Sequence, residues 1–218
     1  MQGLTERNKM YTLWIANKNY SSWSLRPWIL LKALNIPFNE QLSYFEDSKS
    51  SHEKFKAFSP SGLVPCLVDG DITVWDSLAI AEYISEDHAQ VWPKDRIARA
   101  WARSAAAEMH SGFTTLRQMC AMNCTNTLKL EKITPELQND LDRLDTLWTE
   151  GLSKFGGKWL AGDSFTAVDA FFAPVVFRAR TYGLTFSATS QAWIDRMLNH
   201  PAMIEWVEAA VKEPIIAY

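Results

Sequence analysis

The spacing of hydrophobic residues along the chain changes near residue 90. Before this point, short apolar runs alternate with short segments of helical spacing, and after it the helical spacing dominates. The alternation predicts the order strand, helix, strand, helix, strand, strand, helix, which is typical of a small α/β domain with one mixed sheet. We therefore expect a disordered leader over residues 1–9, an α/β domain over 10–87, a linker over 88–94 and an all-helical domain over 95–218.

Four strands and three helices are predicted in the α/β domain. The strands cover residues 11–16, 38–44, 66–68 and 72–75, and the helices cover residues 25–34, 47–58 and 77–87. Gly70 lies between the last two strands and predicts a hairpin, because glycine accepts the positive φ of a tight turn. Ser24 is the predicted N-cap of the first helix, because Pro27 then lies in the first turn, where its missing N–H leaves no hydrogen bond unmade.

The second half of the chain is predicted to be a helical bundle without internal repeats. Thr134 and Pro135 predict the N-cap and first turn of one helix, and Thr166 with Asp169 forms a capping-box pattern at the start of another. The first helix of this half is expected to be long and to bend at Gly112. Its predicted core face consists of Ile97, Trp101, Ala105, Met109, Phe113 and Leu116.

Composition and charge narrow the class of protein. The 218 residues are 47% hydrophobic and 22% charged, as in ordinary globular domains. A formal net charge of -3 without a basic run argues against a nucleic-acid partner, and no apolar run is long enough to cross a membrane. The three cysteines are too few for a disulfide framework and favour a cytoplasmic location. Two of them, Cys120 and Cys124, share a helical face but lack further ligands nearby, so no metal site is expected.

Three short polar segments of the α/β domain are candidates for chemistry. Ser21 and Ser22 precede the first helix, and hydroxyls beside free helix N–H groups can bind an anion and lower the pKa of a thiol. Val64-Pro65 precedes the third strand, where a proline without an N–H is tolerated. Asp76 and Ser77 precede the third helix, whose free N–H groups could bind a ligand carboxylate while Asp76 binds a ligand ammonium; plain helix capping is the alternative.

The order and spacing of these segments resemble those of glutathione S-transferases. That family has a serine before the first helix, Val-Pro before the third strand, an acidic residue and serine before the third helix, and a Thr-x-x-Asp box in a helical second domain. The run from Ser21 to Arg26 is similar to the Ser-Ser-Cys-Ser-x-Arg segment of the zeta class, with Trp23 in place of the cysteine. Residues 17–28, together with the later Glu-Met-His-Ser-Gly-Phe segment at 108–113, look like an uncharacterised bacterial branch of that family.

The resemblance implies a thioredoxin-like N-terminal domain that binds glutathione and a helical domain that supplies the second substrate's pocket. Ser21 matches the catalytic serine, with Ser22 as the second candidate. Thr166 and Asp169 match the capping box that supports folding rather than catalysis. A homodimer is also implied by the family.

The same resemblance assigns the expected glutathione contacts. Val64 matches the backbone that pairs with the cysteinyl part of glutathione, and Pro65 matches a cis proline. Asp76 and Ser77 match the pair that binds the γ-glutamyl end. Leu63 departs from the pattern, since many members carry Lys or Gln there.

Because Leu63 cannot donate a side-chain hydrogen bond, the glycyl carboxylate of glutathione would need another donor. His52 or Lys54 could supply it, although the alternative for both is a solvated surface position.

A polar stripe on the predicted long helix contains candidate contacts for the second substrate. Arg96, Arg103, His110 and Arg117 recur every seven residues and stay near one helical face. Facing the cleft, His110 and Arg117 could bind an anionic or polar electrophile, with Trp23 in the pocket wall. Facing water, they form an ordinary solvated surface, and both interpretations stay open.

Three functions are compatible with these residues. The first is a glutathione-dependent transferase that activates the thiol for attack on a small electrophile, with a zeta-like cis-trans isomerase as one form. The second is a catalytically weak glutathione-binding or scaffold protein of the same fold. The third, an oxidoreductase that uses a protein cysteine, is disfavoured because no cysteine lies at the N-terminus of the first helix.

Overall fold

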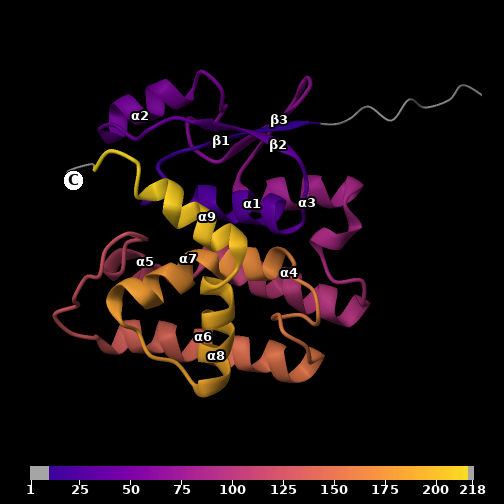
Figure 1. Ribbon diagram of the computed structural model, residues 1–218, viewed down its shortest axis with the longest axis vertical. Coiled ribbons are helices and arrows are strands. Elements are labelled where there is room, and N and C mark those ends of the chain that lie inside the picture. The colour runs from indigo at the N-terminus through magenta and orange to yellow at the C-terminus, as the bar shows by residue number, and fades with distance from the viewer. Residues whose placement is uncertain (1–9, 216–218) are drawn as a thin grey trace, which may run out of the picture.

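A four-stranded mixed sheet organises the first half of the chain (Figure 1). The computed structural model describes residues 10–215, so the leader predicted over 1–9 lies outside the described residues. The strands are β1 (Tyr11–Ile15), β2 (Phe38–Leu42), β3 (Cys66–Asp69) and β4 (Ile72–Trp75), in the spatial order β2-β1-β3-β4. β1 runs parallel to β2 and antiparallel to β3, which pairs antiparallel with β4. The predicted thioredoxin-like domain with one mixed sheet is confirmed.

Three helices accompany this sheet. They are α1 (Ser22–Ala33), α2 (Ser48–Phe55) and α3 (Ser77–Asp87). α1 and α3 pack together between the sheet and the helical domain, while α2 lies towards the top of the view, beyond the sheet (Figure 1). Alternate side chains of a strand point to the same face of a sheet. Tyr11, Leu13 and Ile15 of the central strand β1 therefore share one face, and all three are fully buried in the core.

The second half is all-helical, as predicted. Its elements are the 3₁₀ helix η1 (Ala89–Val91), α4 (Arg96–Ser111), α5 (Thr114–Met119), α6 (Pro135–Phe155), α7 (Ala167–Tyr182), α8 (Ala188–Leu198) and α9 (Pro201–Ala210). α7 is the buried centre and packs against α1, α4 and α8. The predicted helix starts at Thr134-Pro135 and at the Thr166–Asp169 capping box are both confirmed.

The first helix begins earlier than the proline suggested. Its N-cap is Ser21, whose carbonyl accepts from the N–H of Leu25 at 3.2 Å, so the prediction of Ser24 as N-cap was wrong. The Ser24 hydroxyl is buried instead and accepts from the N–H of Ala16 at 3.1 Å. Pro27 therefore lies inside α1, where it cannot make the usual helical hydrogen bond. Packing of the mostly buried α1 against α7 and the sheet outweighs that loss.

The predicted long helix is in fact two helices. α4 ends at Ser111 with Gly112 as its C-cap, Phe113 adopts the left-handed region with φ 57°, and α5 starts at Thr114. The core face of α4 also differs from the prediction, because Ile97 is 64% exposed. The real core face consists of Met109 and four alanines, whose small side chains allow close approach to α7: Ala98, Ala102, Ala105 and Ala106.

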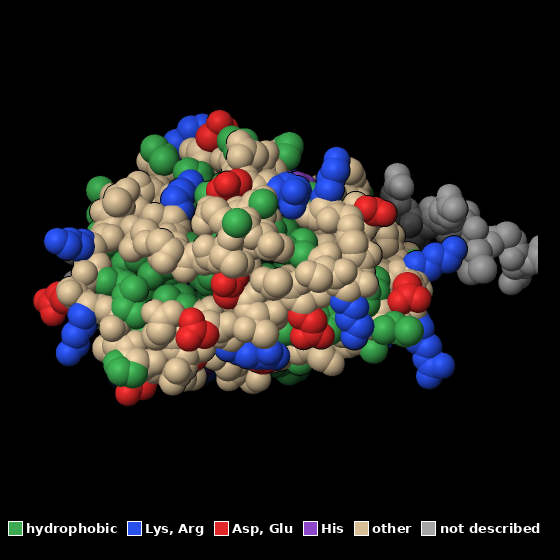
Figure 2. Space-filling view, turned by 90° about the horizontal axis from the view of Figure 1, so that it is seen from below, with side chains coloured by type: hydrophobic (Ala, Val, Ile, Leu, Met, Phe, Trp, Pro, Cys, Tyr) green, Lys and Arg blue, Asp and Glu red, His purple; other side chains and the backbone are tan. Residues whose placement is uncertain are grey.

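The outer surface of the helical domain carries charges of both signs. Basic and acidic side chains are interspersed there, with hydrophobic side chains showing between them (Figure 2). Over residues 10–215, no helix combines the length and apolarity that crossing a bilayer requires. Within the same residues, no cluster of three or more His, Cys, Asp or Glu is arranged to hold a metal ion.

Candidate functional site

A cavity of about 460 Å³ lies beside the N-termini of α1 and α3. Five aromatic side chains contribute to its walls: Tyr20, Trp23, Phe45, Phe55 and Trp75. Its polar lining comes from three separate segments, the start of α1, the loop before β3 and the start of α3. All six residues predicted for catalysis or glutathione binding line it: Ser21, Ser22, Val64, Pro65, Asp76 and Ser77. The structure therefore brings together residues that are up to 56 positions apart in the sequence.

The two serines differ in what their hydroxyls already contact. The Ser21 hydroxyl donates to Oγ of Ser24 at 2.7 Å and accepts from the Ser24 N–H at 3.4 Å. The Ser22 hydroxyl has no hydrogen-bond partner among the described residues. Both side chains are almost completely buried, at 4% and 8% exposure, and both lie at the N-terminal end of α1. This end of a helix presents unpaired N–H groups and positive potential, which favour a negatively charged sulfur.

The loop before β3 supplies a peptide edge. The Val64–Pro65 bond is cis, as the resemblance predicted, and β3 starts at the next residue, Cys66. Neither backbone polar group of Val64 has a hydrogen-bond partner within residues 10–215. A free N–H and C=O on one residue can pair with an extended peptide in the manner of an added strand.

The helix predicted over 77–87 is α3, and its N-cap is Asp76, whose Oδ1 accepts from the N–H of Leu78 at 2.8 Å. Asp and Ser both cap helices well, so the sequence alone does not decide between Asp76 and Ser77 as the cap. Asp76 adopts a positive φ of 73°, which turns the chain sharply at the cavity. Its second oxygen, Oδ2, lies 3.2 Å from Nε2 of His110.

Arg26 is a functional candidate that the sequence reasoning missed. It is only 1% exposed and lies between the rings of Trp23, at 4.1 Å, and Phe171, at 5.1 Å. One terminal nitrogen donates to the Ser77 hydroxyl at 3.4 Å, while its Nε has no partner among the described residues. Burial lowers the pKa of Arg26 well below its usual range, and the positive charges of Arg117 and Arg178 add to the effect. In the sequence, Arg26 stands directly before a proline and four apolar residues, which is unusual for an arginine but points to no partner.

The charge of Arg26 makes the start of α3 attractive for an anion. Burying a guanidinium without a bonded carboxylate costs free energy, unless a bound anion pairs with it. The Arg26 guanidinium lies directly behind Ser77, at the N-terminus of α3, which already favours negative charge.

Comparison with known proteins agrees with this arrangement. Residues 20–87 match the family model of the glutathione S-transferase N-terminal domain, and residues 129–209 match that of the C-terminal domain. Together the two models cover more than half of the chain. The chain belongs to the glutathione S-transferase family.

Relatives with similar sequences span nearly the whole molecule. The chain is 27% identical to glutathione S-transferase GstB of Escherichia coli K12, over 89% of this chain and 96% of that protein. It is 29% identical to a probable maleylacetoacetate isomerase of Caenorhabditis elegans, over 82% of this chain and 81% of that protein. The predicted glutathione S-transferase enzyme and its cosubstrate, glutathione, are thereby confirmed.

Solved structures confirm the fold. A glutathione transferase homolog from Burkholderia with bound glutathione superposes with a TM-score of 0.71 at 22% identity, covering 94% of this chain and all of that one. An unclassified glutathione S-transferase from Bombyx mori gives the same TM-score and identity, covering 92% of this chain and 94% of that one. The predicted combination of a thioredoxin-like domain and a helical domain is thus the fold of this transferase family.

Of the three residues predicted for the transferase's second substrate, only Trp23 lines the cavity. The edge of its ring meets His110, with 5.2 Å between centroids. The Arg117 guanidinium stacks on the same ring at 4.7 Å and donates to the carbonyls of Gly112 and His110 at 2.9 and 3.2 Å. His110 and Arg117 are therefore not in the cavity lining but behind Trp23, and Arg117 caps the C-terminal end of α4.

The remaining members of the polar stripe face solvent. Arg96 and Arg103 are exposed, and Arg103 forms an ion pair with Glu82 at 2.9 Å. Only the C-terminal half of the stripe therefore approaches the site.

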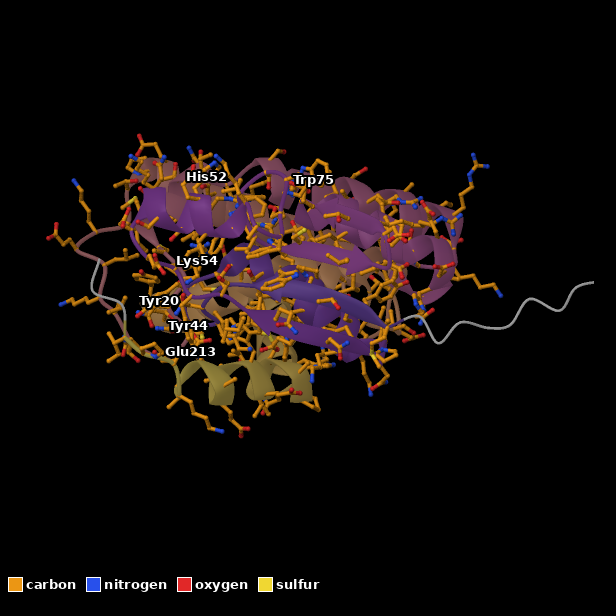
Figure 3. All side chains as sticks on the ribbon, turned by 90° about the horizontal axis from the view of Figure 1, so that it is seen from above. Tyr20, Tyr44, His52, Lys54, Trp75 and Glu213 are labelled. Atoms are coloured by element: carbon orange, nitrogen blue, oxygen red, sulfur yellow. The ribbon has the colours of Figure 1, made fainter. Side chains whose placement is uncertain are left out.

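The candidates for the glycyl end of glutathione are distinguished by their contacts. Lys54 pairs with Glu46 at 3.0 Å and donates to the Tyr44 carbonyl at 3.1 Å. His52 lies against Gly62 and lines a second hollow that shares Leu63 with the main cavity. In Figure 3, His52 and Trp75 both lie near the upper edge of the view, whereas Lys54 lies closer to Tyr44. His52 is the better placed of the two.

The cysteines of the transferase are unsuited to redox chemistry. All three are free and buried. Burial raises the pKa of Cys120 to about 11 and that of Cys124 to about 12, and it also raises the pKa of Cys66. A thiol that stays protonated is a poor nucleophile, so an oxidoreductase based on these residues is disfavoured on physical grounds as well.

Proposed function

We propose that glutathione occupies the 460 Å³ cavity with its sulfur at the N-terminus of α1, where Ser21 stabilises the thiolate for attack on a small electrophile. The observation that supports this most strongly is the convergence of three separate segments on one cavity. Each supplies the group that one part of glutathione needs: hydroxyls for the sulfur, a free peptide edge for the cysteinyl backbone, and a charged pair for the γ-glutamyl end.

The charges of the site set the orientation of the bound tripeptide. The γ-glutamyl ammonium would meet the Asp76 carboxylate, and the α-carboxylate would meet Ser77 and the guanidinium of Arg26 behind it. The cysteinyl backbone would then pair with Val64. This order directs the sulfur towards the start of α1 and leaves the glycyl carboxylate near His52.

The energy required of the site is modest. A free thiol has a pKa of about 8.5, so lowering it by about two units takes about 2.7 kcal/mol of selective thiolate stabilisation. A hydroxyl hydrogen bond to a charged acceptor contributes about 1.5–3 kcal/mol, and a helix N-terminus contributes about 0.3–1 kcal/mol. The Ser21 hydroxyl now donates to Ser24, so it must turn from Ser24 to the sulfur when glutathione binds.

The reaction on the second substrate has two forms. In a transfer reaction the thiolate displaces a leaving group from the electrophile or adds to it, and the thioether is released. In a zeta-like isomerisation the thiolate adds to a conjugated cis-alkene, rotation follows about the resulting single bond, and elimination returns glutathione. The 29% identity to a probable maleylacetoacetate isomerase favours testing the second form. Trp23 takes the place of the zeta cysteine, so the serine alone would act on the thiol.

A substitution at Ser21 tests the proposal. Ser21→Ala should lower the rate of glutathione conjugation to an activated aryl halide at least about tenfold, the loss expected for one hydrogen bond to a charged sulfur, while the fold survives. Ser22→Ala is the matched control. Equal rates for the wild type and Ser21→Ala would remove Ser21 from this role, and a loss confined to Ser22→Ala would transfer the role to Ser22.

The second candidate function is a glutathione-binding protein with little turnover. The engaged Ser21 hydroxyl favours keeping this alternative. Retention on glutathione resin without conjugation of any electrophile in a panel would support it. The predicted homodimer and cytoplasmic location belong to the same proposal, and light scattering and cell fractionation test them.

A further inference from the structure

The loop that leads into α1 is held by the C-terminal segment of the chain. We name residues 16–21 the serine loop. The Glu213 carboxylate accepts from two successive backbone N–H groups of this loop, those of Lys18 at 2.9 Å and Asn19 at 3.3 Å. The indole N–H of Trp206, in α9, donates to the Lys18 carbonyl at 2.8 Å. Residues almost 200 positions away thus bind both sides of the same peptide segment.

The picture of the molecule agrees with this contact. α9 packs alongside α1 below the sheet, and the segment that follows it turns upward at the left of the view (Figure 1). Seen from above, Glu213 lies at the same end of the molecule as Tyr20 and Tyr44 (Figure 3). The C-terminal segment therefore lies at the end of the molecule that carries Tyr20 of the serine loop.

The other contacts of the serine loop leave it little freedom. The carbonyl of Asn17 accepts from the N–H groups of Tyr20 and Ser21 at 3.1 and 2.8 Å, which closes a tight turn. Asn19 bonds to the backbone N–H of Cys124 and, through its side chain, to that of Thr125, at 3.3 and 3.1 Å. Because Ser21 is bonded directly into this turn, a shift of residues 18–19 moves the serine.

The Lys18 side chain does not compete for Glu213. Its ammonium pairs with Glu40 and lies over the rings of Trp28 and Trp206, at 5.9 and 5.5 Å. The Glu213 carboxylate is therefore committed to the backbone. Hydrogen bonds from backbone N–H groups to a carboxylate are charge-assisted and stronger than neutral ones. A half-buried carboxylate in this place binds the loop more firmly than a neutral side chain can.

We propose that Glu213 is a positioning residue that fixes the serine loop so that the Ser21 hydroxyl is held at the sulfur of bound glutathione. This inference rests on the proposed function of Ser21. Without the carboxylate, the N–H groups of Lys18 and Asn19 lose their partner and the turn can relax. The Ser21 hydroxyl then spends less time in reach of the sulfur, and a smaller fraction of the bound glutathione is ionised.

Glu213→Gln tests this with a side chain of nearly the same shape. It should lower kcat about three- to tenfold at a pH below that of thiol ionisation, and leave KM for glutathione within about twofold, because the groups that bind the γ-glutamyl end are untouched. The thiolate absorbance of bound glutathione should titrate at higher pH than in the wild type. Glu208→Gln, at an exposed position of the preceding helix α9, should match the wild type in kcat, in KM and in the titration of the bound thiol.

Combination with Ser21→Ala separates positioning from general damage. If Glu213 acts through Ser21, Glu213→Gln should change kcat less than about twofold in the Ser21→Ala background. Equal losses in both backgrounds, or a wild-type titration of the bound thiol in Glu213→Gln, would overturn the inference and leave the role of Ser21 intact. If Ser21→Ala itself has no effect, the proposed role of Ser21 is wrong, and Glu213 cannot act through it. Glu213→Asp keeps the charge but is too short to serve both N–H groups, so it should give an intermediate loss and replaces the glutamine variant if that one does not fold.

Discussion

Nε2 of His110 lies 3.2 Å from Oδ2 of Asp76, which ties the helical domain to the N-cap of α3. The other oxygen of Asp76 is bonded to the N–H of Leu78, so both carboxylate oxygens are oriented. Burial lowers the pKa of His110, and the charges of Arg26 and Arg117 add to this while Asp76 opposes it. The imidazole is therefore neutral at neutral pH and presents an N–H to the carboxylate. This contact fixes the group that we assign to the γ-glutamyl ammonium.

His110→Ala should weaken glutathione binding through Asp76. We expect KM for glutathione to rise about three- to tenfold with a smaller change in kcat, the range for one lost hydrogen bond to a charged group. Steady-state kinetics measures both. His110→Gln keeps a donor near Asp76 and should recover most of the loss. If the glutamine and alanine variants behave alike, the hydrogen bond is not the reason for the effect.

Arg26 should contribute to recognition of the α-carboxylate of glutathione. Arg26→Met removes the buried charge behind Ser77 and should weaken glutathione binding at least about tenfold in calorimetry. An analogue that lacks the α-carboxylate of the γ-glutamyl residue provides the control, since wild type and variant should bind it about equally. A similar loss for both ligands would mean that Arg26 supports the fold of α1 rather than the ligand.

Gly151 is the one glycine of α6 and should not accept a side chain. A Cβ there would lie 2.3 Å from the Trp101 ring and 2.4 Å from the Leu160 carbonyl. Gly151→Ala should therefore lower the free energy of unfolding by about 1–3 kcal/mol, although alanine is the better helix former. Chemical denaturation measures this. Ser153→Ala, two residues on at an exposed position, should be neutral, and a stabilising Gly151→Ala would contradict the packing described.

Asp169 should make stability depend on pH between about 4 and 6. Burial raises its pKa to about 6, although Leu160, Thr166 and Trp193 donate to its carboxylate. In this range the folded protein holds a proton that the unfolded chain has released, so the contribution of this group to stability falls as the pH rises. From the ordinary value of 3.8, the change is at most about 3 kcal/mol.

The slope of unfolding free energy against pH isolates this effect. Asp169→Asn loses hydrogen bonds and should be less stable overall, but its slope between pH about 4 and 6 should lack the component due to Asp169. The same slope in both proteins would show that Asp169 is already ionised throughout.

Local sequence rules predicted most elements, and the resemblance to glutathione S-transferases added the three segments that line the cavity. The local rules succeeded where a short stretch carries its own signal, as at Thr134-Pro135 or the hairpin at Gly70. They failed at Ser24, because burial of α1 overrides the local preference of a proline, and at Ile97, because α4 packs through its alanines. Arg26 and Glu213 could not be found in this way, since their partners lie 51 and about 195 residues away.

The pKa of the glutathione thiol in the bound state tests the central claim most directly. The ultraviolet absorbance of the thiolate, titrated against pH with the enzyme saturated, measures it. We expect a value about two units below the 8.5 or so of the free thiol in the wild type, and a return towards the free value in Ser21→Ala. A bound thiol that titrates like free glutathione in the wild type would contradict the account.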